Sequence, residues 1–379
     1  MAKETIYDIA IIGAGTMGMA AGAYLAEKKQ RTLLIDAFDP PHTNGSHHGD
    51  TRMIRHAYGE GRQYVDLVKR AQQLWEKLEK QTGLTIFEQT GVIGLGAKDS
   101  AFMKETIEAA STFNLPLEVL SNEQINERWP GFKIPENFIG CFEETSGFIY
   151  SENAIRAYKQ IALEHGAELV TNTPVQQIEK NEHGNVMITT ESRTFYAKKV
   201  IVTAGAWAQK LLSDIALPIQ PTRKVFGWFE AEEDLYQTGK FPAFYIENET
   251  EMCYGFPSVD HTGLKIGRND GGQAINPDKH EQNFGKYNAD EADLRRCLQK
   301  FIPHANQKLV QGKTCMYTNS LDNHFIIDTH PNDDAIIFAC GFSGHGFKFA
   351  SSLGEALGEL AMFGKTRYDL SNFSLGRFR

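Results

Sequence analysis

Residues 7–36 read YDIAIIGAGTMGMAAGAYLAEKKQRTLLID, and this stretch predicts a strand, a tight turn, a helix and a second strand. The apolar run of residues 7–12 is typical of a parallel strand that is buried on both faces. Small and apolar side chains then recur at helical spacing, and Lys28 and Lys29 are expected to supply cations to the last turn of this helix. The second strand, residues 32–35, follows at once, so the chain opens with a Rossmann-type βαβ unit.

The turn between the first strand and the helix carries Gly13, Gly15 and Gly18 in the pattern G-x-G-x-x-G. The first glycine permits the tight turn, the second lets the backbone approach a pyrophosphate, and the third lets the helix pack against the strand. The helix N-terminus offers free N–H groups and partial positive charge to the phosphates. Asp36 ends the second strand where the acid that binds an adenosine ribose hydroxyl is expected, and its charge disfavours the 2′-phosphate of NADP. The motif therefore predicts a dinucleotide site but does not separate NAD from FAD.

Composition narrows the class of protein. The chain has 379 residues, 41% of them hydrophobic, which is enough for two domains with sizeable cores. A net charge of -9 and a pI near 5.8 argue against nucleic acid and against an anionic membrane as partners. No apolar run approaches the length of a membrane span and we expect no signal peptide, so we predict a cytoplasmic protein.

The cysteines and histidines give no pattern of a disulfide framework or a metal site. Five cysteines are an odd number without a paired motif, which fits reduced thiols. No Cys or His pair has zinc-ligand spacing, and the adjacent His47 and His48 would face opposite ways on a strand. We therefore predict no metal, and we expect four of these cysteines to be small buried side chains: Cys141, Cys253, Cys297 and Cys340.

The later segments alternate between two patterns. Residues 62–82 predict an amphipathic helix that ends at a glycine cap, and residues 199–205 predict a further Rossmann-like strand. Between residues 222 and 319, short aromatic-rich strands predict a mostly antiparallel sheet. A last helix is expected over residues 347–363. Because no flexible linker separates these patterns, two domains must be interleaved in sequence or joined by short connections.

Several short segments together decide which dinucleotide is bound. They resemble the monomeric sarcosine oxidase and N-methyltryptophan oxidase family, they keep the order of that family, and they span almost the whole chain. The resemblance implies FAD, because the first two segments match the part of that family that contacts the flavin. The matching segments are GSHHGDTR (45–52), IRHAYGEG (54–61), GFPS (255–258), LKIG (264–267), CMYT (315–318) and GFSGHGFK (341–348).

The resemblance implies an α/β fold (α+β overall) with a Rossmann-type FAD-binding domain and a second, mostly antiparallel β-sheet catalytic domain. The expected FAD-binding domain comprises residues 1–87, 147–221 and 320–379, and the expected catalytic domain comprises 88–146 and 222–319. Members of the family oxidise the N–CH3 group of an N-methyl amino acid to an imine and pass the electrons through FAD to O2, giving H2O2. Water then releases formaldehyde and the free amino acid. The implied partners are a small N-methyl or secondary amino acid and O2, and the chain is expected to be a monomer.

The resemblance also implies how the cofactor is held. Cys315 matches the family cysteine that is bonded covalently to the 8-methyl carbon of the flavin, and a thiolate is the reactive form for such a bond. Arg52 and His48 match residues near the flavin ring, where cations favour the anionic reduced form. A helix N-terminus near the pyrimidine edge of the flavin ring would stabilise the negative charge that collects there on reduction. The remaining residues assigned to the cofactor are Thr51, Val175, Gly344, Gly346 and Phe347.

Lys265 lies between Leu264 and Ile266, so alternation turns its side chain away from both. On pattern alone it would be a lysine on the wet face of a strand. In the family, the matching lysine activates oxygen, and a fixed cation in a dry site does stabilise the superoxide that forms first.

Arg55 and Lys348 match the pair that holds the substrate carboxylate. Guanidinium binds carboxylate through two parallel hydrogen bonds, and the ammonium adds a point charge. Tyr254 and Tyr317 match aromatic walls of the substrate cavity, although aromatic residues on strands are more often plain core. Such a site would orient the N-methyl group for reaction.

Asn269 departs from the family, which has a histidine beside the bound amine at this position. Asparagine can hydrogen-bond but cannot titrate near neutral pH, so the substrate is in doubt. We expect sarcosine to be a poor or moderate substrate and a bulkier secondary amino acid to do better. Two alternatives stay open: an oxidase of another secondary amine, such as a cyclic imino acid or a glycated amino acid, and an FAD-binding protein without turnover.

Overall fold

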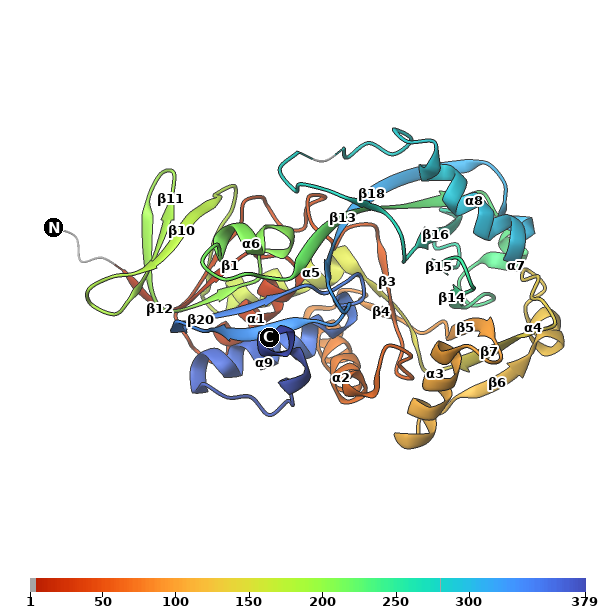
Figure 1. Cartoon of the computed structure of the whole chain (residues 1–379), viewed down its shortest axis with the longest axis horizontal. Helices are drawn as coiled ribbons and strands as arrows, with labels where there is room; N and C mark the ends of the chain where they lie inside the picture. The colour runs from red at the N-terminus through yellow and green to blue at the C-terminus, as the bar shows by residue number, and fades with distance from the viewer. Residues whose placement is uncertain (1–4, 280) are drawn as a thin grey trace.

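The computed structural model describes residues 5–279 and 281–379, and its first sheet is built around the apolar opening strand (Figure 1). β1 (Ile6–Ile12) pairs in parallel with β2 (Thr32–Ile35) on one side and with β12 (Thr194–Val202) on the other. β20 (Asp333–Cys340) extends the parallel part beside β12, and β19 (Ile326–His330) pairs antiparallel with β20. The main path through the sheet is β10-β11-β12-β1-β2-β9. Its outer strands are β9 (Glu168–Val170), β10 (Val175–Lys180) and β11 (Val186–Thr190).

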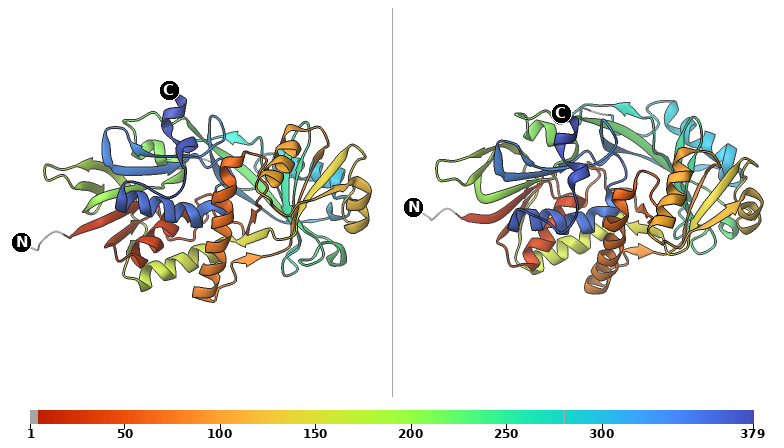
Figure 2. Two further views of the ribbon diagram at one scale, coloured as in Figure 1. Left: turned by 90° about the horizontal axis from the view of Figure 1, so that it is seen from below. Right: turned by 60° about the horizontal axis from the view of Figure 1, so that its bottom comes forward.

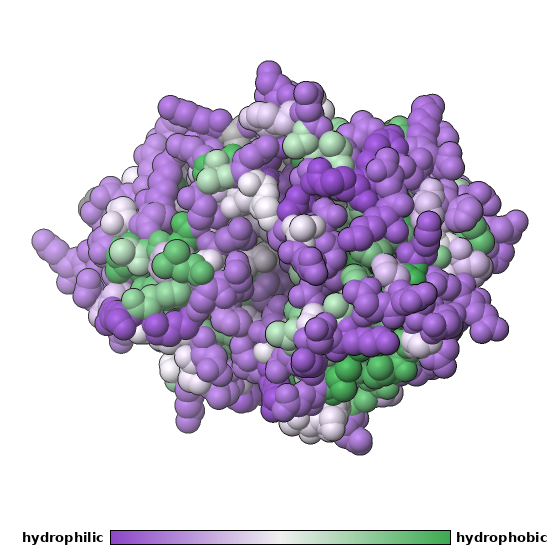
Figure 3. Space-filling view, turned by 45° about the vertical axis from the view of Figure 1, so that its right-hand side comes forward, coloured by the Kyte–Doolittle hydropathy of each residue, from purple (hydrophilic) through white to green (hydrophobic). Residues whose placement is uncertain are grey.

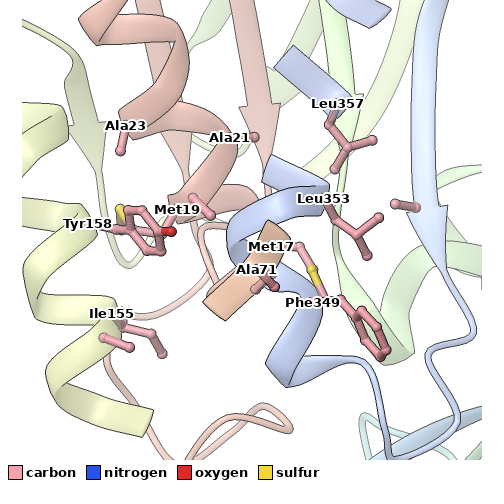
Figure 4. Close-up of a cluster of buried hydrophobic side chains, with 14 of the residues drawn as sticks. Met17, Met19, Ala21, Ala23, Ala71, Ile155, Tyr158, Phe349, Leu353 and Leu357 are labelled. Carbon is pink, nitrogen blue, oxygen red and sulfur yellow. The ribbon is translucent and has the colours of Figure 1, made fainter. Parts of the chain in front are cut away.

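Four helices pack together on one side of this sheet, with α1 and α9 directly against its strands (Figure 2). They pack closely because α1 presents alanines and glycines: a Cβ on Gly354 of α9 would lie 2.6 Å from the Cβ of Ala20. Figure 4 shows the resulting core, in which Met17 and Met19 lie among side chains of the neighbouring helices, such as Tyr158 and Leu353. The helices are α1 (Thr16–Glu27), α2 (Val65–Thr82), α5 (Ser151–Glu164) and α9 (Ala350–Phe363).

The second sheet lies at the right in Figure 1 and follows the order β17-β13-β16-β15-β14-β5-β7-β6, with β18 beside β13. All its pairs are antiparallel except that of β14 with β5. Its strands are β5 (Val92–Ala97), β6 (Glu118–Ser121), β7 (Phe138–Glu143), β13 (Ile219–Phe229), β14 (Ala243–Glu247), β15 (Met252–Phe256), β16 (Leu264–Arg268), β17 (Gln273–Ala274) and β18 (Leu309–Ser320). The accompanying helices are α3 (Ala101–Thr112), α4 (Asn122–Arg128), α7 (Glu233–Tyr236) and α8 (Ala289–Phe301).

A small third sheet joins the two large ones. β3 (Thr51–Ile54) and β4 (Phe87–Glu88) both pair antiparallel with β8 (Gly147–Tyr150). The second sheet is thus built from two separate stretches of chain that leave the first sheet and return to it. This arrangement confirms the predicted combination of a parallel Rossmann-type sheet and a mostly antiparallel sheet interleaved in sequence, while the exact domain boundaries stay a prediction.

Most expected elements are present near the predicted positions. Helix α2 ends at Gly83, which has φ 70°, and α9 ends at Gly364, which has φ 69°, so both glycines adopt the left-handed cap conformation. One detail was wrong: α1 ends at Glu27, so Lys28 and Lys29 follow the helix instead of lying in its last turn. Short 3-10 turns complete the fold: η1 (Arg62–Tyr64), η2 (Gly205–Trp207), η3 (Pro303–Ala305), η4 (Phe347–Phe349), η5 (Ser371–Phe373) and η6 (Leu375–Phe378).

The surface over the second sheet is mainly hydrophilic, and its hydrophobic side chains gather in a few separate patches (Figure 3). Among the described residues, no helix combines the length and the apolarity that crossing a membrane requires. That described part of the chain also holds no group of three His, Cys, Asp or Glu side chains placed to bind a metal ion. All five cysteines are buried and unpaired.

Candidate active site

The glycine-rich turn is shaped as a dinucleotide cradle. Gly13 has φ 92°, and a Cβ there would lie 2.6 Å from the carbonyl oxygen of Thr203. A Cβ on Gly18 would lie 1.9 Å from the carbonyl oxygen of Gly13, so helix and strand touch at that point. By contrast, a Cβ on Gly15 would meet nothing closer than 3.6 Å, which leaves the backbone open on the side where a pyrophosphate would lie.

Asp36 braces this turn from the end of β2. Its carboxylate accepts hydrogen bonds from the backbone N–H groups of Ala14, at 2.7 Å, and Phe38, at 2.8 Å. The N–H of Thr173 donates to the carbonyl of Asp36 at 2.9 Å, so the segment just before Val175 runs beside the turn. The structure therefore brings the glycines and Asp36 into one site and leads Val175 toward it.

Unpaired polar atoms mark where a polar ligand would bind. Among the described residues, the buried Oγ1 of Thr16, at the start of α1, has no hydrogen-bond partner. The same holds for both ring nitrogens of His48 and for Oγ1 of Thr318. Buried polar atoms are normally paired, so these positions fit a large polar group such as FAD. Burial, and then the nearby charge of Arg52, lower the pKa of His48 to about 4, so in the ligand-free chain its ring is neutral near pH 7.

Arg52 is fixed by backbone carbonyls. Its guanidinium donates to Thr51 O at 2.8 Å, to Ser46 O at 2.8 Å and to His48 O at 2.6 Å, and it lies 5.9 Å from the ring of Phe347. Within the described residues the hydrogen bonds of Arg52 go to backbone carbonyls and none goes to a carboxylate, so its charge is available to a neighbouring anion.

Lys265 is buried, with 2% of its surface exposed, and does not lie on a wet face of the sheet. Its Nζ donates to Gly49 O, to Thr51 O at 3.1 Å and to Thr51 Oγ1 at 3.0 Å. Burial lowers the pKa of this amine well below its usual value. Three acceptors nevertheless match the three N–H bonds of an ammonium, whereas a neutral amine has two, so the geometry favours the charged form.

A cavity of about 80 Å³ lies between strands of the second sheet, strand β3 and the segment before α9, next to this group. Its lining includes Arg52 and Phe347 together with both expected carboxylate binders and both expected aromatic walls. The structure thus brings together residues from β3, β14, β15, β18 and the segment before α9. The lining residues are Arg52, Met53, Arg55, Glu60, Tyr245, Met252, Cys253, Tyr254, Phe256, Asn269, Tyr317, Gly344, His345, Phe347 and Lys348.

Arg55 is held in an aromatic sandwich. Its guanidinium carbon lies 4.4 Å from the ring centre of Tyr58 and 4.6 Å from that of Tyr245. The group forms an ion pair with Glu60 at 2.5 Å and donates to Ala57 O at 2.8 Å. Burial alone would lower the pKa of Arg55, but the Glu60 carboxylate outweighs it and leaves the pKa raised. Arg55 is therefore a permanent buried cation whose partner in the ligand-free chain is Glu60.

Lys348 lies beside Arg55, and no carboxylate among the described residues forms an ion pair with it. Its Nζ donates to the hydroxyl of Tyr58 at 3.1 Å and to His345 O at 3.2 Å. Burial, and then the charge of Arg55, lower the pKa of Lys348 to about 7. Two adjacent cations served by one carboxylate leave room for a second carboxylate from a ligand.

The wall of the cavity opposite Arg55 and Lys348 is formed by two tyrosine rings and the amide side chain of Asn269. Gly344 has φ 80°, and a Cβ there would lie 2.1 Å from the ring of Tyr317, so only glycine lets the chain pass this close. Asn269 follows β16, and its amide nitrogen contacts the sulfur of Met252 at 3.7 Å. Tyr254 completes this wall.

Cys315 lies on β18 opposite Lys224 of β13 and is 5% exposed. Burial raises the pKa of its thiol, while the charges of Arg52, Lys224 and Lys265 act in the opposite direction. These cations are the groups that would stabilise a thiolate once a ligand fills the site.

Sequence reasoning missed several residues of the site. Glu60 lies inside the matched segment 54–61, yet nothing in its pattern indicated an ion pair with Arg55. Lys224 was also missed: its buried Nζ donates to the carbonyls of Asn269, at 2.7 Å, and of Asp270 and Gly271, so it fixes the backbone beside the cavity. Tyr245 could have been noticed only as an aromatic residue on a strand.

A family model described as FAD dependent oxidoreductase matches residues 8–360. The chain is a member of this family. Binding of FAD and oxidoreductase activity therefore apply to this flavoprotein, and the cradle, Asp36 and the unpaired polar atoms fit that cofactor.

Individual relatives place this FAD dependent oxidoreductase within the monomeric sarcosine oxidase and N-methyltryptophan oxidase group. It is 51% identical over 378 residues to a monomeric sarcosine oxidase from Bacillus sp. (strain NS-129), covering 99% of this chain and 97% of that protein. It is 42% identical over 374 residues to an N-methyl-L-tryptophan oxidase from Yersinia pestis (strain Pestoides F), covering 98% and 100%. The resemblance inferred from the short segments is thus confirmed.

Solved structures support the fold. The flavoprotein superimposes with a TM-score of 0.87 on L-proline dehydrogenase from P. horikoshii, at 22% identity and covering 99% of this chain and 98% of that one. It superimposes with a TM-score of 0.86 on NikD, an unusual amino acid oxidase, at 20% identity and covering 98% of both chains. At these identities the likeness concerns the fold alone.

Proposed function

We propose that this flavoprotein oxidises the N-methyl group of a small N-methyl amino acid with O2, giving the free amino acid, formaldehyde and H2O2. One observation carries the proposal: Arg55 and Lys348, two buried cations, line the same small cavity as Tyr254 and Tyr317. Such a cavity suits a short ligand with a carboxylate at one end and a small N-methyl amine that packs against aromatic rings at the other. Two of the relatives described above carry names for oxidases of this substrate class.

In the proposed reaction the substrate carboxylate binds between Arg55 and Lys348. Glu60 and Ala57 O accept hydrogen bonds from two of the five N–H groups of Arg55 in the ligand-free chain, so others are left for the substrate carboxylate. Glu60 keeps the guanidinium paired before the substrate arrives, which limits the cost of holding a buried charge. The anchored substrate then directs its amine toward Tyr254, Tyr317 and Asn269.

Bound FAD supplies the two-electron redox chemistry. The overall change is R–NH–CH3 + O2 + H2O to R–NH2 + HCHO + H2O2, so the two electrons and two hydrogens removed from the amine end in peroxide. We assign Lys265 to the oxygen step, because its fixed charge stabilises the anion that forms when O2 accepts an electron. Arg52, held by three carbonyls, adds a second fixed charge.

We also propose that FAD is attached covalently through Cys315. The bond would join its Sγ to the 8-methyl carbon of the flavin, and O2 would accept the hydrogens removed from thiol and methyl group as H2O2. Acid denaturation should leave the yellow colour on the protein, and Cys315→Ala should release it. Cys253→Ala is the control, because Cys253 is at least as deeply buried as Cys315 and lines the neighbouring substrate cavity. Free FAD in the supernatant of the parent protein would reject covalent attachment.

The volume of the cavity bears on the choice of substrate. About 80 Å³ is roughly half of the ~150 Å³ cavity that accommodates benzene, so an indole side chain would not fit without rearrangement. This argues for a small substrate such as sarcosine, against the expectation drawn from Asn269 that a bulkier amino acid would do better. A panel of N-methyl, cyclic and glycated amino acids with peroxide detection ranks the candidates. A cyclic imino acid or glycated amino acid at the top would replace the proposed substrate, and absence of anaerobic flavin bleaching by every amine would indicate a protein without turnover.

The proposal includes the organisation expected from the sequence. We propose an FAD-binding domain of residues 1–87, 147–221 and 320–379 and a catalytic domain of 88–146 and 222–319. We also propose a monomer in the cytoplasm, where reduced thiols such as the five buried cysteines persist. Size-exclusion chromatography with light scattering tests the monomer.

A further inference from the structure

A second cavity lies on another side of Lys265. It has about 310 Å³, against about 80 Å³ for the substrate cavity, and shares only Phe256 with that cavity. Lys265 lines the second cavity and does not line the first. The residues around it are Asp50, Thr51, Tyr150, Glu152, Asn153, Arg156, Trp228, Phe256, Pro257, Val259, Asp260, Thr262 and Lys265.

This cavity runs from solvent to a buried end. Asp50, Arg156, Asp260 and Thr262 at its rim are exposed. At the inner end, Trp228 is 5% exposed, Phe256 is 1% exposed and Lys265 is 2% exposed. The cavity therefore reaches Lys265 from the surface without crossing the substrate cavity.

The chemistry of the walls restricts what can use this route. Toward the inner end the walls are apolar, formed by Trp228, Phe256, Pro257 and Val259. All three N–H bonds of Lys265 already point at the oxygens of Gly49 and Thr51, so the ammonium has no hydrogen bond left for an anionic ligand. The inner end of the cavity therefore suits a small neutral molecule that needs no hydrogen bond and is affected only by the nearby positive charge. It does not suit a carboxylate, which needs hydrogen-bond donors.

The wall near the rim is held rigidly. Glu152 accepts hydrogen bonds from the backbone N–H groups of Gly49 and Asp50, at 2.7 and 3.1 Å, and from the hydroxyl of Ser151, at 2.6 Å. These bonds tie the loop that carries Gly49 to the start of α5. The opening is thus built into the loop and helix, and does not depend on a chance arrangement of side chains.

We infer that this second cavity is the passage by which dioxygen reaches Lys265 and peroxide leaves, separate from the path of the amino acid substrate. The inference rests on the proposed function, because it takes Lys265 as the group that acts on oxygen. It adds that oxygen has its own entrance, bordered by Val259 and Thr262, and that the ring of Phe256 divides the two cavities. Oxygen can then arrive while the substrate cavity is still filled.

The test is to obstruct the passage at residues that touch neither the substrate cavity nor Lys265. Val259→Trp fills the inner part, and Thr262→Trp, at an exposed position, narrows the rim if the first variant folds poorly. Val119→Trp is the matched control, because Val119 is 50% exposed on β6, far along the same sheet. Stopped-flow measurements separate anaerobic flavin reduction by the amine from reoxidation by O2.

The second-order rate constant for reoxidation should fall about tenfold or more in Val259→Trp, while flavin reduction changes less than about twofold. Crystals pressurised with xenon, an apolar probe, should hold it at the inner end in the parent and lose it in the variant. Reoxidation within about twofold of the parent in both folded tryptophan variants would overturn the passage. Lys265→Met separates the two proposals: unchanged reoxidation there rejects the role of Lys265, and slow reoxidation there beside unaffected tryptophan variants rejects the passage alone.

Discussion

The pKa of Lys348 makes binding of the substrate carboxylate depend on pH. Burial and then the charge of Arg55 bring this pKa from 10.5 down to about 7, so near neutral pH about half of the ligand-free molecules carry a neutral lysine. A carboxylate bound beside Nζ favours the ammonium and raises the pKa again. Binding above pH 7 therefore has to take up a proton.

The size of the effect follows from this linkage. If only the ammonium form binds well, the apparent Kd of a carboxylate should rise about 25-fold between about pH 6.5 and about pH 8.5, or about 2 kcal/mol. The direction of the effect is fixed, because the pKa of Lys348 is lower in the free site than in the complex with a carboxylate. Affinity is therefore highest well below pH 7 and falls as the pH rises. Lys348→Arg, which stays charged, should show almost no change over this range.

Flavin absorbance titrations with butyrate, a carboxylate without an amine, measure this Kd free of substrate ionisation. Calorimetry in buffers of different ionisation enthalpy measures the proton uptake directly. A Kd that is constant over the range would refute the reasoning. An equally steep pH dependence of the Kd in Lys348→Met would assign that dependence to another group. The candidate closest in pKa is Lys224, with a pKa of about 8.

Three further outcomes follow from the site. Arg55→Ala should weaken butyrate binding by about 2–5 kcal/mol and leave neutral amines nearly unaffected, as titrations of both ligand types would reveal. Asn269→His should add an ionisation near ~6.5 to the pH profile of kcat/KM and shift the ranking of substrates toward sarcosine; an unchanged profile and ranking would remove Asn269 from the substrate site. Gly18→Ala should lower the thermal unfolding temperature of the apoprotein, because its Cβ would lie 1.9 Å from Gly13 O, whereas Gly15→Ala should keep that temperature and lose affinity for FAD.

The local sequence pattern was sufficient to predict the turns, helix ends and strand alternation, because these depend on neighbouring residues alone. The turn at Gly13 and the helix ends at Gly83 and Gly364 follow from conformations that glycine adopts most easily. Alternation along β16 correctly turned Lys265 away from Leu264, which lies in the core of the second sheet.

What pattern could not give was the identity of partners far away in the sequence. The acceptors of Lys265 come from residues 49 and 51, more than two hundred positions earlier in the chain. The three carbonyls that bind Lys224 belong to the loop after β16. The sequence also did not decide whether Glu60 would point toward solvent or toward Arg55. These contacts depend on how the sheets are assembled, and the family resemblance named functional residues without naming such supports.

The connectivity of the first sheet has a consequence for how the protein is made. β1 is among the first segments to leave the ribosome, but its neighbour β12 is aligned with it through Ile11 and Ile201, 190 positions apart, and β20 follows much later. At about 5–20 residues per second, roughly 10–40 s pass before β12 is even synthesised. During that time the edge of β1 that faces β12 stays unpaired and this apolar strand has to be kept from aggregating, so nascent chains of this protein are candidates for chaperone binding. The dinucleotide turn that begins the fold is among the last parts of it to be completed.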